Sequence, residues 1–382
     1  MKRTTWMLAV LGLFLFAQSA LADWTPAKRI TWTAEDSISG KIGVDSSGII
    51  HVVWEESTAD WDEIYYKRSP DGGLTWTTGQ RITWGERLFR YPHFALDSSG
   101  NPHVAWYDEA YGHNEIYYKM SPDGGATWTS SRRLTWATWS RYPRVAADSS
   151  DNPHVVWRDA MSGDWEVYHK TSTDGGATWL ASRRLTWTSG SSGDPAIAID
   201  PADNLHVVWA DDTPGNFEIF YRKSPDGGAT WAANRQLTWT AEDSVFPMLS
   251  ADPSGHLHLV WGDNTPGSTE IYYKKSTDGG ATWTPAKRIT WGSSLLIGPD
   301  IATDPSGNPH VVWMDDTSGN DEIYYTKSTN GGDNWSLSNR LTWNPGRSGW
   351  PDIATDPSGN VHVVWQDNTP GNTQIFYKQY IK

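Results

Sequence analysis

Two copies of an Arg-Tyr-Pro motif are the part of this sequence best suited to bind a ligand. They read Arg90-Tyr91-Pro92-His93 and Arg141-Tyr142-Pro143-Arg144. A guanidinium can hold a carboxylate through two parallel hydrogen bonds. The motifs therefore predict a receptor for an anionic group, with candidate contacts at Arg90, Tyr91, His93, Arg141, Tyr142 and Arg144. The alternative is that Arg90 and Arg141 form ion pairs with acidic loops nearby.

Positions equivalent to these motifs carry other charges elsewhere in the chain. Lys41 follows the counterpart of the motif's proline, and acidic residues stand at Asp194, Asp300 and Asp352. Around a common axis, these segments would make a mouth that is basic on one side and acidic across it.

The 26 tryptophans divide into a repeated set and a few extra residues. Twenty-one recur at equivalent places, which predicts packing between sheets, each ring stabilising the fold by up to roughly 5 kcal/mol. Trp6 lies in the apolar N-terminal segment. The four that remain are candidate ligand contacts: Trp61, Trp139, Trp165 and Trp350.

The elements that position these residues come from one repeat of about 52 residues. His-Val-Val-Trp or a close variant begins at His51, His103, His154, His206, His258, His310 and His362. Each copy is followed by Glu-Ile-Tyr-Tyr-Lys or a variant, then by Ser-x-Asp-Gly-Gly-x-x-Trp, then by Arg-Leu/Ile-Thr-Trp. Short β-branched and aromatic runs between turn-forming residues predict four strands, A to D, in each repeat. Four strands per repeat of this length are typical of a β-propeller blade.

The two ends of the chain predict how the ring closes. The last repeat stops after a strand C, and residues 23–36 supply an isolated strand D. We therefore expect an all-β, seven-bladed propeller of four-stranded antiparallel blades spanning 23–382, in which the N-terminal strand completes the C-terminal blade. Because sequence variation gathers in the B–C and D–A loops, the face that carries them is the predicted binding face.

Two repeated features favour structural roles. The box aspartates can accept backbone N–H bonds within their own turns, and they stand at Asp71, Asp123, Asp174, Asp226, Asp278 and, as a variant, Asn330. Seven of the 11 histidines begin strand B, once per blade. No spacing typical of a metal site appears, so we expect no metal and no cofactor.

Composition limits the remaining possibilities. Residues 1–22 have the basic start, apolar core and small-residue cleavage site of a signal peptide, which predicts a secreted or periplasmic protein. Without that segment the formal charge is about −16, which disfavours nucleic acid as a partner. We expect no membrane span, and the absence of cysteine excludes disulfides.

The box motif resembles that of the sialidase-type Asp-box propellers over the whole mature chain. Phe89-Arg90-Tyr91-Pro92 is similar to the motif whose arginine holds the substrate carboxylate in that family, so the resemblance implies this role for Arg90. Arg158 and Arg347 are the candidates for its further arginines, and Tyr91, Tyr107 and Tyr142 for its nucleophile. The family's sialidases have six blades, whereas seven are counted here.

Three functions are compatible with the sequence. The first is a secreted module that binds glycans on the B–C/D–A face without catalysis. The second is an exo-sialidase-like glycoside hydrolase, and the third is a scaffold that docks protein partners.

Overall fold

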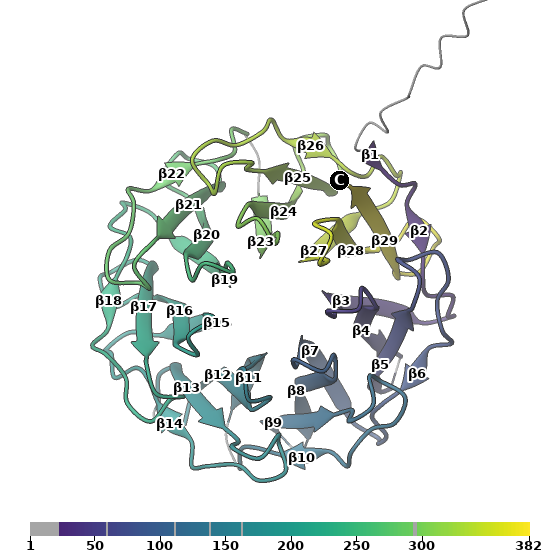
Figure 1. Ribbon diagram of the computed structural model, residues 1–382, viewed down its shortest axis with the longest axis horizontal. Coiled ribbons are helices and arrows are strands. Elements are labelled where there is room, and N and C mark those ends of the chain that lie inside the picture. Colours follow the sequence, from purple (N-terminus) through teal and green to yellow (C-terminus); the bar gives the residue numbers. More distant parts are fainter. Residues whose placement is uncertain (1–22, 59, 111, 137–138, 162, 293–295) are drawn as a thin grey trace, which may run out of the picture.

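The computed structural model describes residues 23–58, 60–110, 112–136, 139–161, 163–292 and 296–382, so the predicted signal peptide lies outside it. This part of the chain forms seven blades around a central axis (Figure 1), of which the first two are joined into one eight-stranded sheet by a parallel bridge between Asp62 and Leu88. The predicted all-β propeller of four-stranded antiparallel blades is confirmed.

The blades follow one another in chain order. Blade 1 contains β3 (Asp36–Val44), β4 (Ile50–Ser57), β5 (Asp62–Ser69) and β6 (Gln80–Arg81), and blade 2 contains β7 (Leu88–Leu96), β8 (Pro102–Ala110), β9 (His113–Met120) and β10 (Arg132–Arg133). Blade 3 contains β11 (Ser140–Ala147), β12 (Pro153–Asp159), β13 (Glu166–Thr171) and β14 (Arg183–Arg184). Blade 4 contains β15 (Ser192–Ile199), β16 (Leu205–Asp211), β17 (Glu218–Ser224) and β18 (Arg235–Gln236). Blade 5 contains β19 (Ser244–Ala251), β20 (Leu257–Asp263), β21 (Glu270–Ser276) and β22 (Lys287–Arg288).

The last two blades complete the ring. Blade 6 contains β23 (Leu296–Thr303), β24 (Pro309–Asp315), β25 (Glu322–Lys327) and β26 (Asn339–Arg340). Blade 7 contains β27 (Ser348–Thr355), β28 (Val361–Asp367) and β29 (Gln374–Ile381), and is completed by β1 (Asp23–Trp24) and β2 (Lys28–Arg29). In β2, Lys28 pairs with Tyr377 of β29, which confirms the predicted closure by the N-terminal strand.

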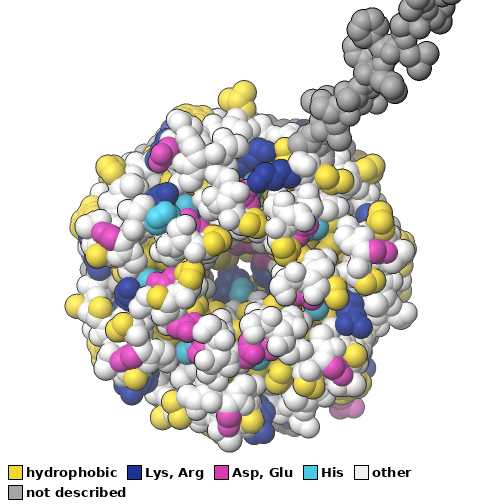
Figure 2. Space-filling view, viewed as in Figure 1, with side chains coloured by type: hydrophobic (Ala, Val, Ile, Leu, Met, Phe, Trp, Pro, Cys, Tyr) yellow, Lys and Arg dark blue, Asp and Glu magenta, His cyan; other side chains and the backbone are white. Residues whose placement is uncertain are grey.

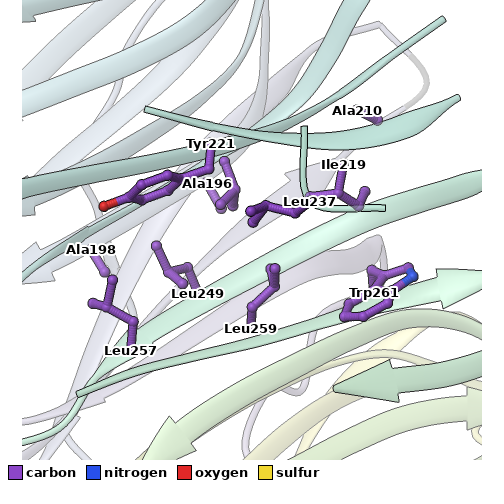
Figure 3. Close-up of a cluster of buried hydrophobic side chains, with 11 residues drawn as sticks. Ala196, Ala198, Ala210, Ile219, Tyr221, Leu237, Leu249, Leu257, Leu259 and Trp261 are labelled. Atoms are coloured by element: carbon purple, nitrogen blue, oxygen red, sulfur yellow. The ribbon is translucent and has the colours of Figure 1, made fainter. Parts of the chain in front are cut away.

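The hydrophobic core lies between neighbouring blades. Figure 3 shows one such layer, in which Ile219 and Tyr221 of blade 4 pack against Leu249, Leu259 and Trp261 of blade 5. The strand-B residues are buried on both faces, because a blade covers each side of them. This explains why strand B is a continuous apolar run rather than an alternating one.

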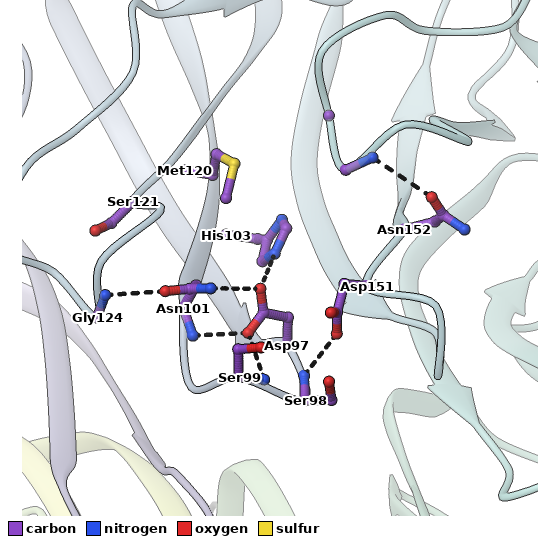
Figure 4. A network of polar contacts seen from close by, with 12 residues as sticks. Asp97, Ser98, Ser99, Asn101, His103, Met120, Ser121, Gly124, Asp151 and Asn152 are labelled. Carbon is purple, nitrogen blue, oxygen red and sulfur yellow. Dashed lines mark hydrogen bonds and ion pairs between the residues drawn. The ribbon is translucent and has the colours of Figure 1, made fainter.

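The repeated histidines join strand B to the preceding turn. His103 Nδ1 lies 2.6 Å from the Tyr118 hydroxyl. Its Nε2 lies 3.3 Å from an Asp97 oxygen (Figure 4). Asn101 donates a hydrogen bond to Asp97 and accepts one from the Gly124 backbone at 2.9 Å. The histidine is thus part of a polar network that fixes the A–B turn and the box loop.

Each box aspartate closes its own loop. Asp123 Oδ1 accepts a hydrogen bond from the Thr127 backbone N–H at 2.7 Å, and Asn330 accepts the equivalent bond from Asn334 at 2.8 Å. These bonds lower the pKa of Asp123 to about 2. The second box glycine, Gly125, has a φ of 90°, and a Cβ there would lie 2.1 Å from the Tyr66 hydroxyl of the preceding blade.

The prediction that all repeated tryptophans pack between sheets is wrong for one set. The strand-B tryptophans are buried, but those that follow strand D are 61% to 74% exposed: Trp32, Trp84, Trp136, Trp187, Trp239, Trp291 and Trp343. The reason is that strand D is the outermost strand, so no sheet lies outside it to cover the ring. Within the described ranges, the structure has no helix long and apolar enough to cross a membrane.

Candidate functional site

A bulge in every strand A turns one side chain toward the central channel. The pairing of A with B shifts in register around the Arg-Tyr-Pro position of each blade, as between Arg90 and His93. The residue at the bulge has a positive φ of 50° to 60° in all seven blades: Ser39, Tyr91, Tyr142, Asp194, Phe246, Gly298 and Trp350. A bulky residue in this conformation costs about 1–3 kcal/mol and persists only where the surroundings impose it.

These seven bulges surround a cavity of about 460 Å³ at one mouth of the channel. Figure 2 shows the central opening, with Lys, Arg and His side chains at its depth. The cavity lies at the start of the A strands, and therefore on the side of the D–A and B–C loops. Among the sequence-predicted residues, its lining contains Tyr91, His93, Tyr142, Arg144, Asp300 and Trp350, together with Lys41, Arg158 and Asp194.

Tyrosines and an arginine form one wall of this cavity. The Tyr91 ring lies 4.9 Å from the Tyr142 ring and 5.7 Å from the Tyr107 ring, between centroids. The Arg158 guanidinium lies 4.5 Å from the Tyr142 ring and 4.5 Å from the Trp165 ring. Of these residues, Tyr91, Tyr142 and Arg158 line the cavity. The wall therefore combines aromatic faces with positive charge.

Two arginines in the wall are not neutralised by ion pairs. Among the residues that the structure describes, neither Arg144 nor Arg158 has a carboxylate within ion-pair distance, and the buried Arg158 Nε has no hydrogen-bond partner. Burial raises the pKa of Asp194, although Arg158 and Arg144 act in the opposite direction. The two guanidinium groups bring positive charge to the cavity, where an anion would accept charge-assisted hydrogen bonds from their accessible N–H groups.

The opposite side of the cavity is acidic. The predicted contact Asp352 is buried behind this side and is not part of the lining: it pairs with Lys41 at 2.7 Å and accepts the Ile42 backbone N–H at 2.8 Å. Asp300 accepts the Ile353 N–H at 3.0 Å, and its pKa is raised to about 7 by burial and by the nearby Asp352 charge.

His93 stands beside the arginine wall as an uncharged group. Its Nδ1 accepts a hydrogen bond from the Val145 backbone N–H at 3.2 Å. Burial lowers the pKa of His93 well below its ordinary value. The positive charge of this wall therefore comes from Arg144 and Arg158.

In two blades, the residue after the strand-B tryptophan supports the bulge of the next blade. Glu55 accepts the Tyr91 backbone N–H at 3.0 Å, and Gln366 accepts the Ser39 N–H at 3.1 Å. Burial raises the pKa of Glu55 to about 7. These two supporting contacts, and the places of Phe246 and Met248 in the cavity lining, were not predicted from the sequence. A signal was present, because the position after His-Val-Val-Trp varies while its neighbours recur.

Both motif arginines lie outside the cavity lining. Arg90 Nε lies 2.7 Å from an Asp62 oxygen, and its Nη1 lies 4.0 Å from Glu109. Arg141 donates to the Asn114 side chain at 3.1 Å and lies against the Trp139 ring at 5.6 Å.

Three of the four extra tryptophans are also apart from the cavity. Trp61 and Trp139 are exposed on the loop face. Trp165 lines a smaller neighbouring cavity of about 210 Å³, together with Arg158 and Asp194. Arg347, suggested as a further carboxylate-binding arginine, is exposed and lies 3.5 Å from Asp321.

No protein-family model and no curated protein matches the chain. Solved structures do match over most of its length. A protein of unknown function from Dyadobacter fermentans DSM 18053 matches at 15% identity and a TM-score of 0.58, covering 93% of this chain and 98% of that one. A polysaccharide lyase, the ulvan lyase bound to -[GlcA(1-4)Rha3S]-, matches at 10% identity and 0.60, covering 91% and 95%.

Sialidases match as well. The leech intramolecular trans-sialidase complexed with 2,7-anhydro-Neu5Ac shows 12% identity and a TM-score of 0.52, with 93% of this chain and 70% of that one covered. At such identities the shared property is the fold. The chain therefore has the propeller fold found in sialidases and in this polysaccharide lyase.

Proposed function

We propose that this protein is an exported glycan-binding protein that holds an acidic sugar in the cavity at the channel mouth. The observation that carries the proposal is the pair of arginines, Arg144 and Arg158, which line the cavity without an ion pair among the described residues. A sugar carboxylate would accept hydrogen bonds from them, and Tyr91, Tyr142 and Trp350 offer aromatic faces for the ring.

Two further observations support an acidic sugar. The formal charge of the whole chain is −14, so most of its surface repels an anion. Binding of an anion therefore needs a local positive site, which the two arginines provide. Proteins of the same fold are bound to acidic sugars in their solved structures, namely 2,7-anhydro-Neu5Ac and a GlcA-containing oligosaccharide.

The experiment is calorimetric titration of residues 23–382 with glucuronate and sialyl oligosaccharides, and with their neutral counterparts. We expect Arg144→Met and Arg158→Met each to weaken binding of the acidic sugars by roughly 10- to 100-fold, as loss of a charge-assisted hydrogen bond implies. The matched control is Arg347→Met, because Arg347 is exposed and outside the cavity. Equal affinity in all three variants would refute the proposal.

Cleavage of the bound sugar is the second candidate function. Asp300 lines the cavity with Tyr91 and Tyr142, and its pKa of about 7 suits proton transfer near neutral pH. The same mixtures should be analysed for released sugars and for the ultraviolet absorbance of unsaturated uronates. Products that disappear with Asp300→Asn would establish catalysis. Unchanged sugars would leave binding as the function, and no binding at all would favour a protein-docking scaffold.

A further inference from the structure

The exposed tryptophans that follow strand D form a second, repeated feature on the outer rim. The D strands of all seven blades lie on the circumference of the ring (Figure 1), far from the central cavity. Their tryptophans are 61% to 74% exposed, so most of each indole is in contact with solvent. Contacts within the chain therefore cover only the smaller part of each ring.

Comparison of the repeats shows that the tryptophan is retained where other exposed positions vary. The residue five positions earlier is also exposed in every blade, and it reads Ala27, Gly79, Ser131, Ser182, Asn234, Ala286 and Ser338. Contacts within the chain leave most of each indole in solvent, so the seven retained rings form a repeated exposed aromatic surface that a ligand can contact.

The geometry beside Trp239 shows what that contact would meet. A groove of about 260 Å³ separates Trp239 of blade 4 from Tyr272 and Lys274 of blade 5. Lys274 Nζ lies 5.8 Å from the centre of the Trp239 ring and donates one hydrogen bond to the Leu237 carbonyl. An ammonium has three N–H donors, so the lysine has donors left for a ligand.

The other walls of this groove are polar and short. Thr238, Thr240 and Thr265 line it together with the Asp263 carboxylate. Asp263 accepts hydrogen bonds from Trp261 Nε1 and from the Thr265 backbone. The groove thus offers one aromatic platform, several hydroxyl groups and one lysine opposed by one aspartate.

The same arrangement recurs around the rim. A lysine or arginine on strand C of the next blade bonds to the carbonyl two residues before the tryptophan and lies 4.9 to 5.8 Å from its ring: Lys67, Lys119, Lys170, Arg222, Lys274 and Lys378. The exception is Trp291, because Thr326 occupies the equivalent position of blade 6.

We propose that the groove at Trp239, and the equivalent rim positions that carry the same tryptophan and cation, each bind one pyranose unit of a neutral glycan, which makes the protein multivalent. The apolar face of a pyranose matches an indole ring, while its hydroxyls match the lysine and threonine groups. Lys274 is opposed by Asp263 in the Trp239 groove, and in five blades a strand-D arginine is paired with a glutamate of strand C, as Arg288 is with Glu270 at 2.6 Å. An acidic sugar therefore gains little here, and an apolar peptide or lipid would bury the lysine without a partner.

The test is titration of residues 23–382 with cellohexaose, laminarihexaose, maltohexaose and mannohexaose, followed by calorimetry and by tryptophan fluorescence. We expect at least one of these to bind weakly and with more than one site per chain. Retention on the matching immobilised polysaccharide should exceed the affinity for the hexaose by ~10²- to 10⁴-fold, because several grooves bind together. In Trp187→Ala/Trp239→Ala/Trp343→Ala, the number of sites should fall by three and retention at least tenfold.

Two controls separate this proposal from the central cavity. Leu180→Ala/Leu337→Ala removes exposed apolar side chains that are not part of the repeat, and it should bind as the unchanged protein does. Arg144→Met should leave neutral-glycan binding intact even if it abolishes binding of acidic sugars. The proposal is wrong if none of the four hexaoses binds, if only one site is found, or if the triple variant, folded by circular dichroism, is retained normally.

Discussion

Lys41 in the first blade forms an ion pair with Asp352 in the last blade, with 2.7 Å between Lys41 Nζ and Asp352 Oδ1. The two residues are 311 positions apart in sequence, and both side chains are largely buried. Asp352 also accepts the Ile42 N–H. One carboxylate therefore links the two blades that meet where the ring closes.

Removal of this carboxylate should destabilise the ring. We expect Asp352→Ala to lower the free energy of unfolding by about 2–4 kcal/mol, because the Lys41 ammonium and the Ile42 N–H lose their acceptor. The measurement is urea unfolding followed by tryptophan fluorescence. Lys41→Met/Asp352→Asn should lose less, since no buried charge is left unpaired. A loss below about 0.5 kcal/mol in Asp352→Ala, the range of ordinary surface substitutions, would contradict this role.

Glu55 should make the protein less stable as the pH rises. Its pKa is about 7 in the folded protein because of burial, against an ordinary 4.5, so the folded state binds the proton more tightly. The contribution of Glu55 to the free energy of unfolding is therefore fully present below pH 4.5. It is lost as the pH rises through 7, by up to about 3 kcal/mol. Glu55→Gln should remove this contribution and raise stability at pH 8.

The chain contains its own precedent for that substitution. Gln366 occupies the same position in blade 7 and accepts the Ser39 N–H as Glu55 accepts that of Tyr91. Unfolding at pH 5 and pH 8 provides the comparison, with Glu35→Gln at an exposed site as the control. An unchanged pH dependence in Glu55→Gln would show that Glu55 is ionised in the folded protein.

Asp300 should make the binding of acidic sugars pH-dependent. Its pKa is about 7, so it is largely protonated at pH 6 and ionised at pH 8. An ionised Asp300 in the cavity repels a carboxylate, and affinity for glucuronate should therefore fall as the pH rises through 7. Titrations at several pH values test this. Asp300→Asn should bind equally at pH 6 and pH 8, whereas a persistent dependence would assign the effect to another group.

Trp350 offers a way to empty part of the cavity without unfolding the protein. Its φ is 50°, and glycine already occupies the equivalent position of blade 6, where Gly298 has a φ of 60°. We expect Trp350→Gly to change the free energy of unfolding by less than about 1 kcal/mol, because relief of the left-handed backbone offsets the lost contacts. Binding of acidic sugars should nevertheless weaken.

The control for this variant is Trp61→Gly. Trp61 is similarly exposed on the loop face, but its φ is not positive. Glycine there should destabilise the protein by about 0.5–1 kcal/mol, through backbone entropy, and leave sugar binding unchanged. Both variants should be compared by thermal unfolding and by titration with acidic sugars. A Trp350→Gly variant less stable than Trp61→Gly would exclude backbone strain at Trp350.

Much of the architecture follows from the sequence by itself. The repeated His-Val-Val-Trp and Arg-Leu/Ile-Thr-Trp motifs predict the strands and their number, and the incomplete repeats at the two ends predict closure. These inferences succeed because turn chemistry and apolar periodicity are local properties, and a ring of like blades has one way to satisfy its edges. The sequence also predicted that Tyr91, Tyr142 and Trp350 lie together at the mouth of the channel. The reason is that equivalent positions of the blades lie at the same distance from the ring axis.

Only the tertiary structure decided which charged and aromatic residues are available. Arg90 carries the recognisable motif, yet it lies beside Asp62. Arg158 directly follows a tryptophan that looks structural, yet it has a donor without a partner. Trp239 and Trp261 both end repeated motifs, yet one is 72% exposed and the other is buried. A repeat specifies which residue recurs, but exposure and pairing depend on the neighbouring blade that covers it, and that contact is made only when the ring is formed.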